Sequence, residues 1–333
     1  MHRKMDENQA LGVMGALSAA LLFGFSFLAV KVAVTQASVL TVLGWRFFLA
    51  FIAMSLCAAL GIFKLRFRGK SLWPLVVMAL CQPILYFVLE TLGIQMTTAS
   101  ESGTIMACIP LVTLLLMPVL AHEQPTRRQW ASIGISVAGV ILVGVTKGMQ
   151  ASFSLSGYLL LILATVSDAA FLNLSRLAAG FTGVEKSYVM AGMGALAFTA
   201  AALVEHGRAG TLGAFLQLPL RNRAFLLSIL YLSVGCSVMA FILRNVGVAR
   251  LGPGRTGSFA GITTLVSVFA GVLLLGEPFS PLQGVGTLLV LAGIYGANMV
   301  PRSARAVTAL PAGEAPPAAG EVAPTDGGPG GAG

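Results

Sequence analysis

The sequence predicts an all-α polytopic membrane protein with ten transmembrane helices in two inverted five-helix repeats. Three observations lead to this prediction: the composition, ten long apolar stretches, and an internal duplication. Of the 333 residues, 56% are hydrophobic and only 10% are charged, and the mean hydropathy is +0.88. Soluble proteins carry about 25% charged residues. The composition therefore excludes an ordinary soluble domain and a disordered chain.

Ten stretches are long and apolar enough to cross a bilayer, which requires about 20 residues per helix. The connections between them are short and leave no room for an inserted soluble catalytic domain. Arg3 and Lys4 precede the first stretch, so a cleaved signal peptide is an alternative there; the long apolar run and the duplication favour a membrane helix. The predicted spans are 11–34, 38–63, 72–94, 103–121, 129–146, 156–178, 187–204, 224–246, 257–276 and 282–300.

The distribution of basic residues predicts the orientation, because cytoplasmic loops carry more Lys and Arg. With the N-terminus inside, fifteen of the 21 basic residues lie on the inner side and five on the outer side. We therefore expect a multi-pass cell (inner) membrane protein with both termini cytoplasmic, and no nucleic-acid partner. The four cysteines lie in predicted spans without a C-x-x-C pair and the three histidines are scattered, so no metal or other cofactor is predicted.

An internal duplication relates the two halves of the chain with an offset of 154 residues. Gly103 corresponds to Gly257, Glu123 to Glu277, and Gln129 to Gln283. Each copy holds five predicted helices, and an odd number places the second copy upside down in the membrane. Inverted repeats are typical of transporters, with the substrate site at the repeat interface. The predicted segments are a cytoplasmic N-terminal segment (1–9), repeat 1 (10–146), repeat 2 (152–301) and a disordered cytoplasmic tail (302–333).

Some duplicated residues have a structural explanation. We expect Glu123 and Glu277 to anchor the ends of helices four and nine. Thr126-x-x-Gln129 and Ser280-x-x-Gln283 have the spacing of capping boxes. Pairs of small residues in helices five and ten favour close helix packing, with a homodimer contact as the alternative; they are Gly134-x-x-x-Ala138 and Ala292-x-x-x-Gly296.

Ionisable residues inside predicted spans are candidates for the substrate or proton pathway, because charges in a membrane are costly and face a cavity or a partner. Arg46 can pair with Glu90, and Asp168 with Arg244. These pairs either lock the fold or open toward substrate or a proton. Glu101 and its repeat equivalent Arg255 lie near helix starts, where snorkelling to the interface is the alternative.

Prolines inside spans indicate interrupted helices, because proline frees the carbonyl four residues earlier. The candidates for helix breaks and cavity lining are Pro83, Pro110 and Pro118 in repeat 1, with Ser237 and Thr264 at equivalent positions in repeat 2. A static kink is the alternative for each. Tyr86 lies one turn from Glu90, where an aromatic ring beside a carboxylate can receive an amine-bearing substrate.

Several of these motifs are similar to those of a known family. Each half closes with small residues, an apolar helix, L-x-x-E-x-P or G-E-P, and a glycine-spaced helix; Arg46 lies in W-R-F-F and Pro110 in helix four. Over about residues 10–301 the chain resembles the EamA-like members of the drug/metabolite transporter superfamily. The resemblance implies a ten-helix transporter of small molecules. One departure is that repeat 2 has no equivalent of Arg46.

The predicted function is secondary transport, with export of an amino acid or related metabolite by alternating access between the repeats. Efflux of drugs or cationic compounds is the alternative, favoured by Glu90 and Glu101 on the outer side. No G-x-x-x-x-G-K-[ST] sequence is present, so the chain has no P-loop for ATP hydrolysis. An enzyme is not predicted, because no cluster of catalytic side chains is present.

Overall fold

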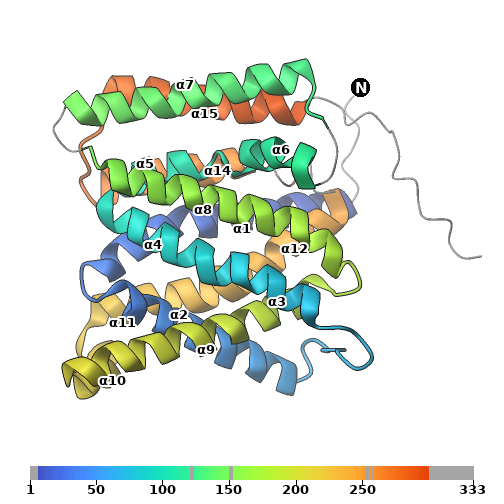
Figure 1. Cartoon of the computed structure of the whole chain (residues 1–333), viewed down its shortest axis with the longest axis vertical. Coiled ribbons are helices and arrows are strands. Elements are labelled where there is room, and N and C mark those ends of the chain that lie inside the picture. The colour runs from blue at the N-terminus through green and yellow to red at the C-terminus, as the bar shows by residue number, and fades with distance from the viewer. Residues whose placement is uncertain (1–6, 121–123, 150–152, 252–255, 257–258, 300–333) are drawn as a thin grey trace, which may run out of the picture. The chain divides into compact units, whose positions relative to one another are not determined.

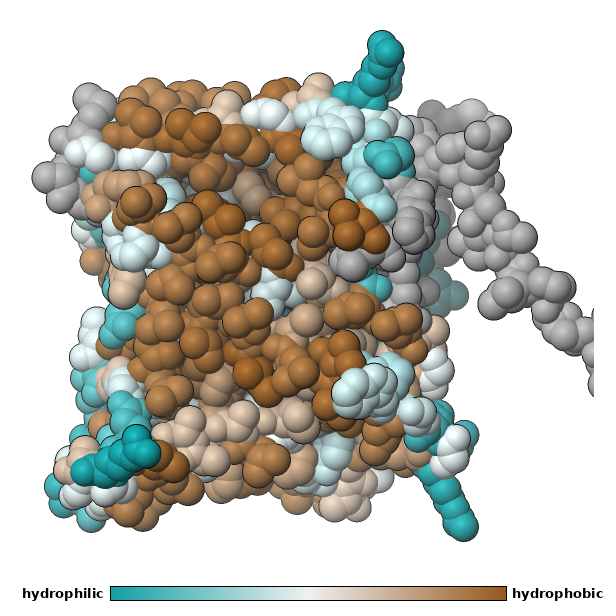
Figure 2. All heavy atoms as spheres, in the orientation of Figure 1, coloured by the Kyte–Doolittle hydropathy of each residue, from teal (hydrophilic) through white to brown (hydrophobic). Residues whose placement is uncertain are grey.

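The computed structural model describes residues 7–120, 124–149, 153–251, 256 and 259–299, and these residues are helical apart from short connections (Figure 1). The predicted tail (302–333), Glu123, Arg255 and Gly257 lie outside the described residues. Apolar side chains form a broad band over the face in Figure 2, with hydrophilic side chains concentrated at the two ends of the helices. This pattern matches a protein that spans a membrane.

The first half contains five spans, of which the third and fourth are interrupted. Its elements are α1 (Glu7–Val34), α2 (Val39–Ala59), α3 (Trp73–Ala79), η1 (Leu80–Leu85), α4 (Tyr86–Met96), α5 (Ala99–Met106), α6 (Ile109–Leu120) and α7 (Arg127–Met149). The third span is α3, η1 and α4 in succession, and the fourth is α5 and α6.

The second half repeats this order and adds one helix, α10, which the sequence analysis did not predict. Its elements are α8 (Leu155–Leu174), η2 (Ser175–Ala178), α9 (Gly183–Ala209), α10 (Leu212–Arg221), α11 (Arg223–Leu230), η3 (Tyr231–Ala240), α12 (Phe241–Leu251), α14 (Ala260–Leu274) and α15 (Pro281–Met299). Within the described ranges, eight apolar helices are long enough to span a membrane and two more are shorter. The predicted all-helical, duplicated fold is confirmed.

Helices of the two halves pack against one another in pairs. The packed pairs are α7 with α15, α2 with α9, α4 with α8, and α5 with α14, while α1 packs on α12 and α14. In Figure 1, α7 and α15 lie together along one edge of the bundle, and α2 and α9 lie toward the opposite edge. The core between them therefore contains side chains from both repeats.

Helix starts are set by hydroxyl side chains that cap free backbone N–H groups. Ser38 caps α2 by accepting from Thr41 N, and Thr182 caps α9 in a capping box with Glu185. Thr98 and Glu101 form a second capping box, which starts α5 at Ala99. The fourth span therefore begins earlier than the predicted residue 103, because the polar T-T-A-S-E segment enters the helix as its cap and first turn.

Two π-helical segments, η1 and η3, occupy equivalent places in the repeats, and η1 also contains a break. Pro83 lies in η1, and Gln82 before it has an extended conformation (φ −141°, ψ 117°) that breaks the helix. The matching region of the second half is η3, which contains Ser237. In the fourth span the break falls between α5 and α6, so Pro110 lies in the first turn of α6, where proline is tolerated. Pro118 lies inside α6.

The α7–α15 contact depends on glycines; of the two predicted pairs Gly296 takes part in it, whereas Ala292 is exposed. A Cβ atom on Gly139 would lie 2.6 Å from the Gly286 carbonyl oxygen, and one on Gly296 would lie 2.7 Å from Ser132 Oγ. Gly134 and Ala138 are exposed, and a Cβ on Gly134 would meet no atom within 4 Å. Gly134-x-x-x-Ala138 is thus not the packing face, because α7 presents its Ser132, Ser136 and Gly139 side to α15.

We predict that Gly139→Val destabilises the protein by about 1–3 kcal/mol, because the added side chain would overlap the α15 backbone. Gly134→Val is the matched control, since it makes the same change on the same helix in open space. Thermal unfolding of both variants in detergent measures the difference. Equal unfolding midpoints would contradict the packing described here.

Candidate functional site

Arg46 on α2 is buried at the centre of the contact between the halves, with 3% of its surface exposed. Its Nε donates to Ser237 Oγ on η3 at 3.2 Å, and its guanidinium lies 4.4 Å from the centre of the Phe87 ring. Ser237 Oγ in turn donates to the Leu232 carbonyl. The hydroxyl therefore binds both the irregular helix of one half and the arginine of the other.

Glu90 and Tyr86 form the second part of the site, on α4. Tyr86 Oη donates to Glu90 Oε1 at 2.7 Å, and both residues are buried. The sequence placed these two side chains one turn apart, and the structure brings them into direct contact. The charge of Arg46, on α2 of the same repeat, acts on Glu90.

Asp168 on α8 is the third part, with 7% of its surface exposed. Its neighbour Ser167 donates to the Cys81 carbonyl at 2.8 Å, which fixes α8 against the broken helix η1. Asp168 is within electrostatic range of Glu90, and Arg244 acts on Asp168 from α12. The site thus gathers two acidic and two basic side chains from both repeats.

The two ion pairs expected from the sequence do not form direct contacts. Within the described part of the chain, neither Arg46–Glu90 nor Asp168–Arg244 lies within the 4.0 Å of a salt bridge. Arg46 is held by Ser237 and the Phe87 ring, Glu90 by Tyr86, and the Arg244 guanidinium lies 5.1 Å from the Phe241 ring centre. The charged side chains therefore contact hydroxyl groups and aromatic rings, and not the oppositely charged side chains that the sequence predicted as their partners.

A small cavity of about 20 Å³ is lined in part by Ser237, the hydrogen-bond partner of Arg46. This volume accommodates about one water molecule, so the cavity has no room for a substrate. The cavity lies between α2, α4, α9, η3 and α12, and is lined by Phe47, Phe87, Ser187, Met190, Ala191, Ser237 and Phe241. Of the predicted cavity-lining residues, Ser237 lines it directly.

Thr264 is placed differently from the other candidates. It is 1% exposed and its Oγ1 donates to the Gly103 carbonyl at 3.4 Å. A Cβ on Gly103 would lie 1.7 Å from Ser267 Oγ, so α5 and α14 are in close contact here. Thr264, Pro110 and Pro118 are not among the residues that line the described cavity. Thr264 joins two helices instead.

Sequence reasoning missed Gln82, which lies in the η1 break. Its side chain is 5% exposed, and its Oε1 has no hydrogen-bond partner among the described residues. The neighbouring Cys81 carbonyl accepts from α8, next to Asp168. A polar residue directly before Pro83 in an apolar span is the signal that could have identified it.

Carboxylates also connect the halves at both ends of the helices. At the end that holds α10, Glu277 accepts from Ala99 N at 2.6 Å and from Ser100 N at 3.0 Å, at the start of α5. Glu101 accepts from Tyr158 Oη at 2.8 Å. Glu277 is thus an anchor, and Glu101 is 2% exposed in a capping box rather than snorkelling to the interface.

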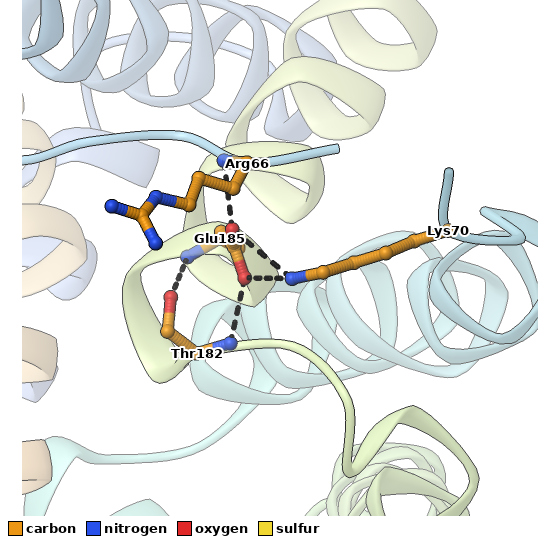
Figure 3. Close-up of polar contacts among 4 residues, drawn as sticks. All are labelled: Arg66, Lys70, Thr182 and Glu185. Atoms are coloured by element: carbon orange, nitrogen blue, oxygen red, sulfur yellow. Dashed lines mark hydrogen bonds and ion pairs between the residues drawn. The ribbon is translucent and has the colours of Figure 1, made fainter. Parts of the chain in front are cut away.

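At the opposite end, Glu185 at the start of α9 holds the loop that follows α2 (Figure 3). Its carboxylate accepts from Arg66 N at 2.8 Å, from Lys70 Nζ at 3.2 Å, and from Thr182 N at 2.8 Å. Lys70 also lies over the Phe181 ring. This cluster is called here the Glu185 clamp. It joins the two repeats at the end of the bundle opposite α10.

The comparisons with known proteins agree with this duplicated arrangement. The model of the EamA-like transporter family matches the chain twice, at residues 10–145 and 155–299. This protein belongs to the EamA-like transporter family, within the drug/metabolite transporter superfamily. It is therefore a membrane transporter and not an enzyme.

Two similar proteins and one solved structure can be compared with this chain. An uncharacterized transporter of Bacillus subtilis, YcxC, is 33% identical over 89% of this chain and 95% of its own. A protein of Streptantibioticus cattleyicolor described as a probable terminal-alkyne amino-acid exporter is 28% identical over 75% of this chain and 80% of its own. A solved crystal structure covers 86% of this chain and 96% of its own with a TM-score of 0.56 at 20% identity, which shows a shared fold.

We predict that Glu185→Ala lowers stability more than a helix cap alone explains. A lost cap costs about 1 kcal/mol, and the lost contacts to Arg66 and Lys70 add about 1–3 kcal/mol because Glu185 is buried. Gln129→Ala is the control, since Gln129 makes the corresponding cap contact with Thr126 alone. Thermal unfolding measures both; equal losses would mean that the clamp does not hold the two repeats together.

Proposed function

We propose that this transporter exports a small metabolite, an amino acid or a related compound, by alternating access between its two repeats. The observation that carries the proposal is the closed polar site between the repeats, formed by Arg46, Glu90, Asp168 and Arg244. Charged groups in a membrane interior are costly and mark pathways for substrates or protons. These four side chains come from four different spans.

The chemistry of the site suits a zwitterion. Arg46 uses Nε for Ser237, and its two Nη groups have no hydrogen-bond partner among the described residues, so they are available to a carboxylate. Asp168 likewise accepts no hydrogen bond from a described residue and is available to an ammonium group. The rings of Phe47, Phe87 and Phe241 would contact an apolar side chain.

The contacts at the two ends suit alternating access. In the proposed orientation, with both termini cytoplasmic, the Glu185 clamp closes the cytoplasmic end and the Glu277 contact closes the outer end. Opening of one end while the other stays closed would expose the central cavity to one side at a time. The probable amino-acid exporter of Streptantibioticus cattleyicolor supports this substrate class and direction.

Counterflow in proteoliposomes tests the proposal with a panel of labelled amino acids. We expect at least one to exchange, and Arg46→Gln to lower its initial rate about tenfold or more, because a hydrogen bond to a charged group contributes about 1.5–3 kcal/mol. Arg68→Gln is the control, since Arg68 is exposed on the loop after α2. Equal rates for the two variants, or no exchange of any amino acid, would contradict the proposal.

Asp168 provides a test of proton coupling. We expect Asp168→Asn to remove the pH dependence of transport, because asparagine keeps the size of the side chain but carries no titratable group. The measurement is uptake rate against pH, with the variant at the same membrane level as the wild type. Unchanged pH dependence would exclude a proton-coupling role for Asp168.

Efflux of cationic compounds is the second candidate, favoured by the Tyr86–Glu90 contact beside the Phe87 ring. An aromatic ring next to a carboxylate attracts organic cations. If this is the function, Tyr86→Leu raises the apparent Michaelis constant for a cationic dye severalfold. An unchanged apparent Michaelis constant would exclude the cationic-substrate alternative.

A further inference from the structure

Helix α10 lies at one end of the bundle (Figure 1), and its two sides carry different side chains. On one side, Phe215 is buried, with its ring 5.4 Å from the Trp45 ring on α2 and 5.1 Å from the His206 ring on α9. On the other, Leu212, Leu216 and Leu220 are 40%, 58% and 85% exposed. Their spacing of four residues places them along one face of the helix. The helix is therefore anchored on α2 and α9 and presents a leucine stripe outward.

A groove of about 470 Å³ lies between α2 and α9 at the same end. Its apolar lining is Leu40, Ala200, Ala201 and Val204, and its polar lining is Glu205 and Arg208. Glu205 and Arg208 lie one turn apart on α9, just before α10. The groove is thus apolar toward the middle of the bundle and has one acidic and one basic side chain at its end.

Both charged groups of the groove can bind a ligand. Glu205 Oε2 accepts from Ser38 Oγ at 2.9 Å, while Oε1 has no hydrogen-bond partner among the described residues. Arg208 is exposed and forms no ion pair within the described ranges. Glu205 and Arg208 thus offer the groove one acidic and one basic group, where a ligand with both charges fits.

We propose that the α2–α9 groove binds a phospholipid with a primary-amine headgroup, phosphatidylethanolamine. Arg208 binds its phosphate, Glu205 accepts a hydrogen bond from its ammonium group, and an acyl chain lies along the apolar lining. The leucine stripe of α10 lies at the boundary of headgroups and acyl chains, as in amphipathic interfacial helices. This places the headgroup level of the membrane beside Glu205 and Arg208. The proposal is independent of the transported substrate.

Native mass spectrometry of the delipidated full-length protein in detergent tests the proposal. We expect at least threefold more bound phosphatidylethanolamine than phosphatidylcholine with the same acyl chains, because the quaternary ammonium of choline has no N–H to donate. Glu205→Gln should remove this preference, since glutamine still accepts from Ser38 but lacks the charge. Arg208→Gln should lower binding of both lipids, and Arg68→Gln, at the opposite end, should change neither.

A further variant and three outcomes that would contradict the proposal complete the test. Ala200→Trp fills the exposed side of the groove without entering the core, and should lower binding of every phospholipid. Equal binding of the two lipids by the wild type, or an unchanged preference in Glu205→Gln, would overturn the proposal. Stronger binding of phosphatidylglycerol than of phosphatidylethanolamine would overturn it too, because the groove would then select anionic lipids through Arg208 without a contribution from Glu205.

Discussion

The cost of placing polar groups in a membrane is the constraint on which the rest of this structure depends. Buried charged groups are stabilised by partners inside the protein, and several of those partners come from the other repeat. Arg46 reaches Ser237, Glu277 reaches the start of α5, and Glu185 reaches the loop after α2. Satisfying these groups therefore joins the two halves more specifically than apolar contact alone, since lipid is as apolar as the helix surfaces.

The same constraint links the broken helices to the central site. A break frees backbone carbonyls, and these need donors that only a neighbouring helix or a local hydroxyl can supply. Ser167 of α8 supplies one to the Cys81 carbonyl of η1, and Ser237 supplies one within η3. Both hydroxyls lie beside charged residues of the candidate site. The irregular backbone and the charges thus stabilise each other at the contact between repeats.

In the proposed mechanism of alternating access, the small cavity and the polar contacts at the two ends belong to one closed state. Carboxylates that accept from several donors, Glu185 and Glu277, hold the two ends. The tight glycine contacts of α7 with α15 and of α5 with α14 differ in kind, since they depend on close backbone approach.

Much of the fold could be predicted from hydropathy and repetition. The thickness of the bilayer sets the length of a spanning helix, and the length of an apolar run can be read from the local sequence. The duplication and the family also followed from the residues, and the Tyr86–Glu90 contact followed from helical spacing. The α10 helix was missed because ten residues between two spans are too few for a transmembrane signal. The early start of α5 was missed because its first turn is polar.

The sequence by itself determined the membrane class, the helical repeats and the positions of the intramembrane charges, since each depends on composition or on spacing along one helix. Only the tertiary structure decided the partners of those charges. Arg46 meets Ser237 and Phe87 rather than Glu90, and Glu185 meets a loop more than one hundred residues away in sequence. Charge alone does not select among several polar and aromatic groups at similar depth; the rotation and packing of whole helices do.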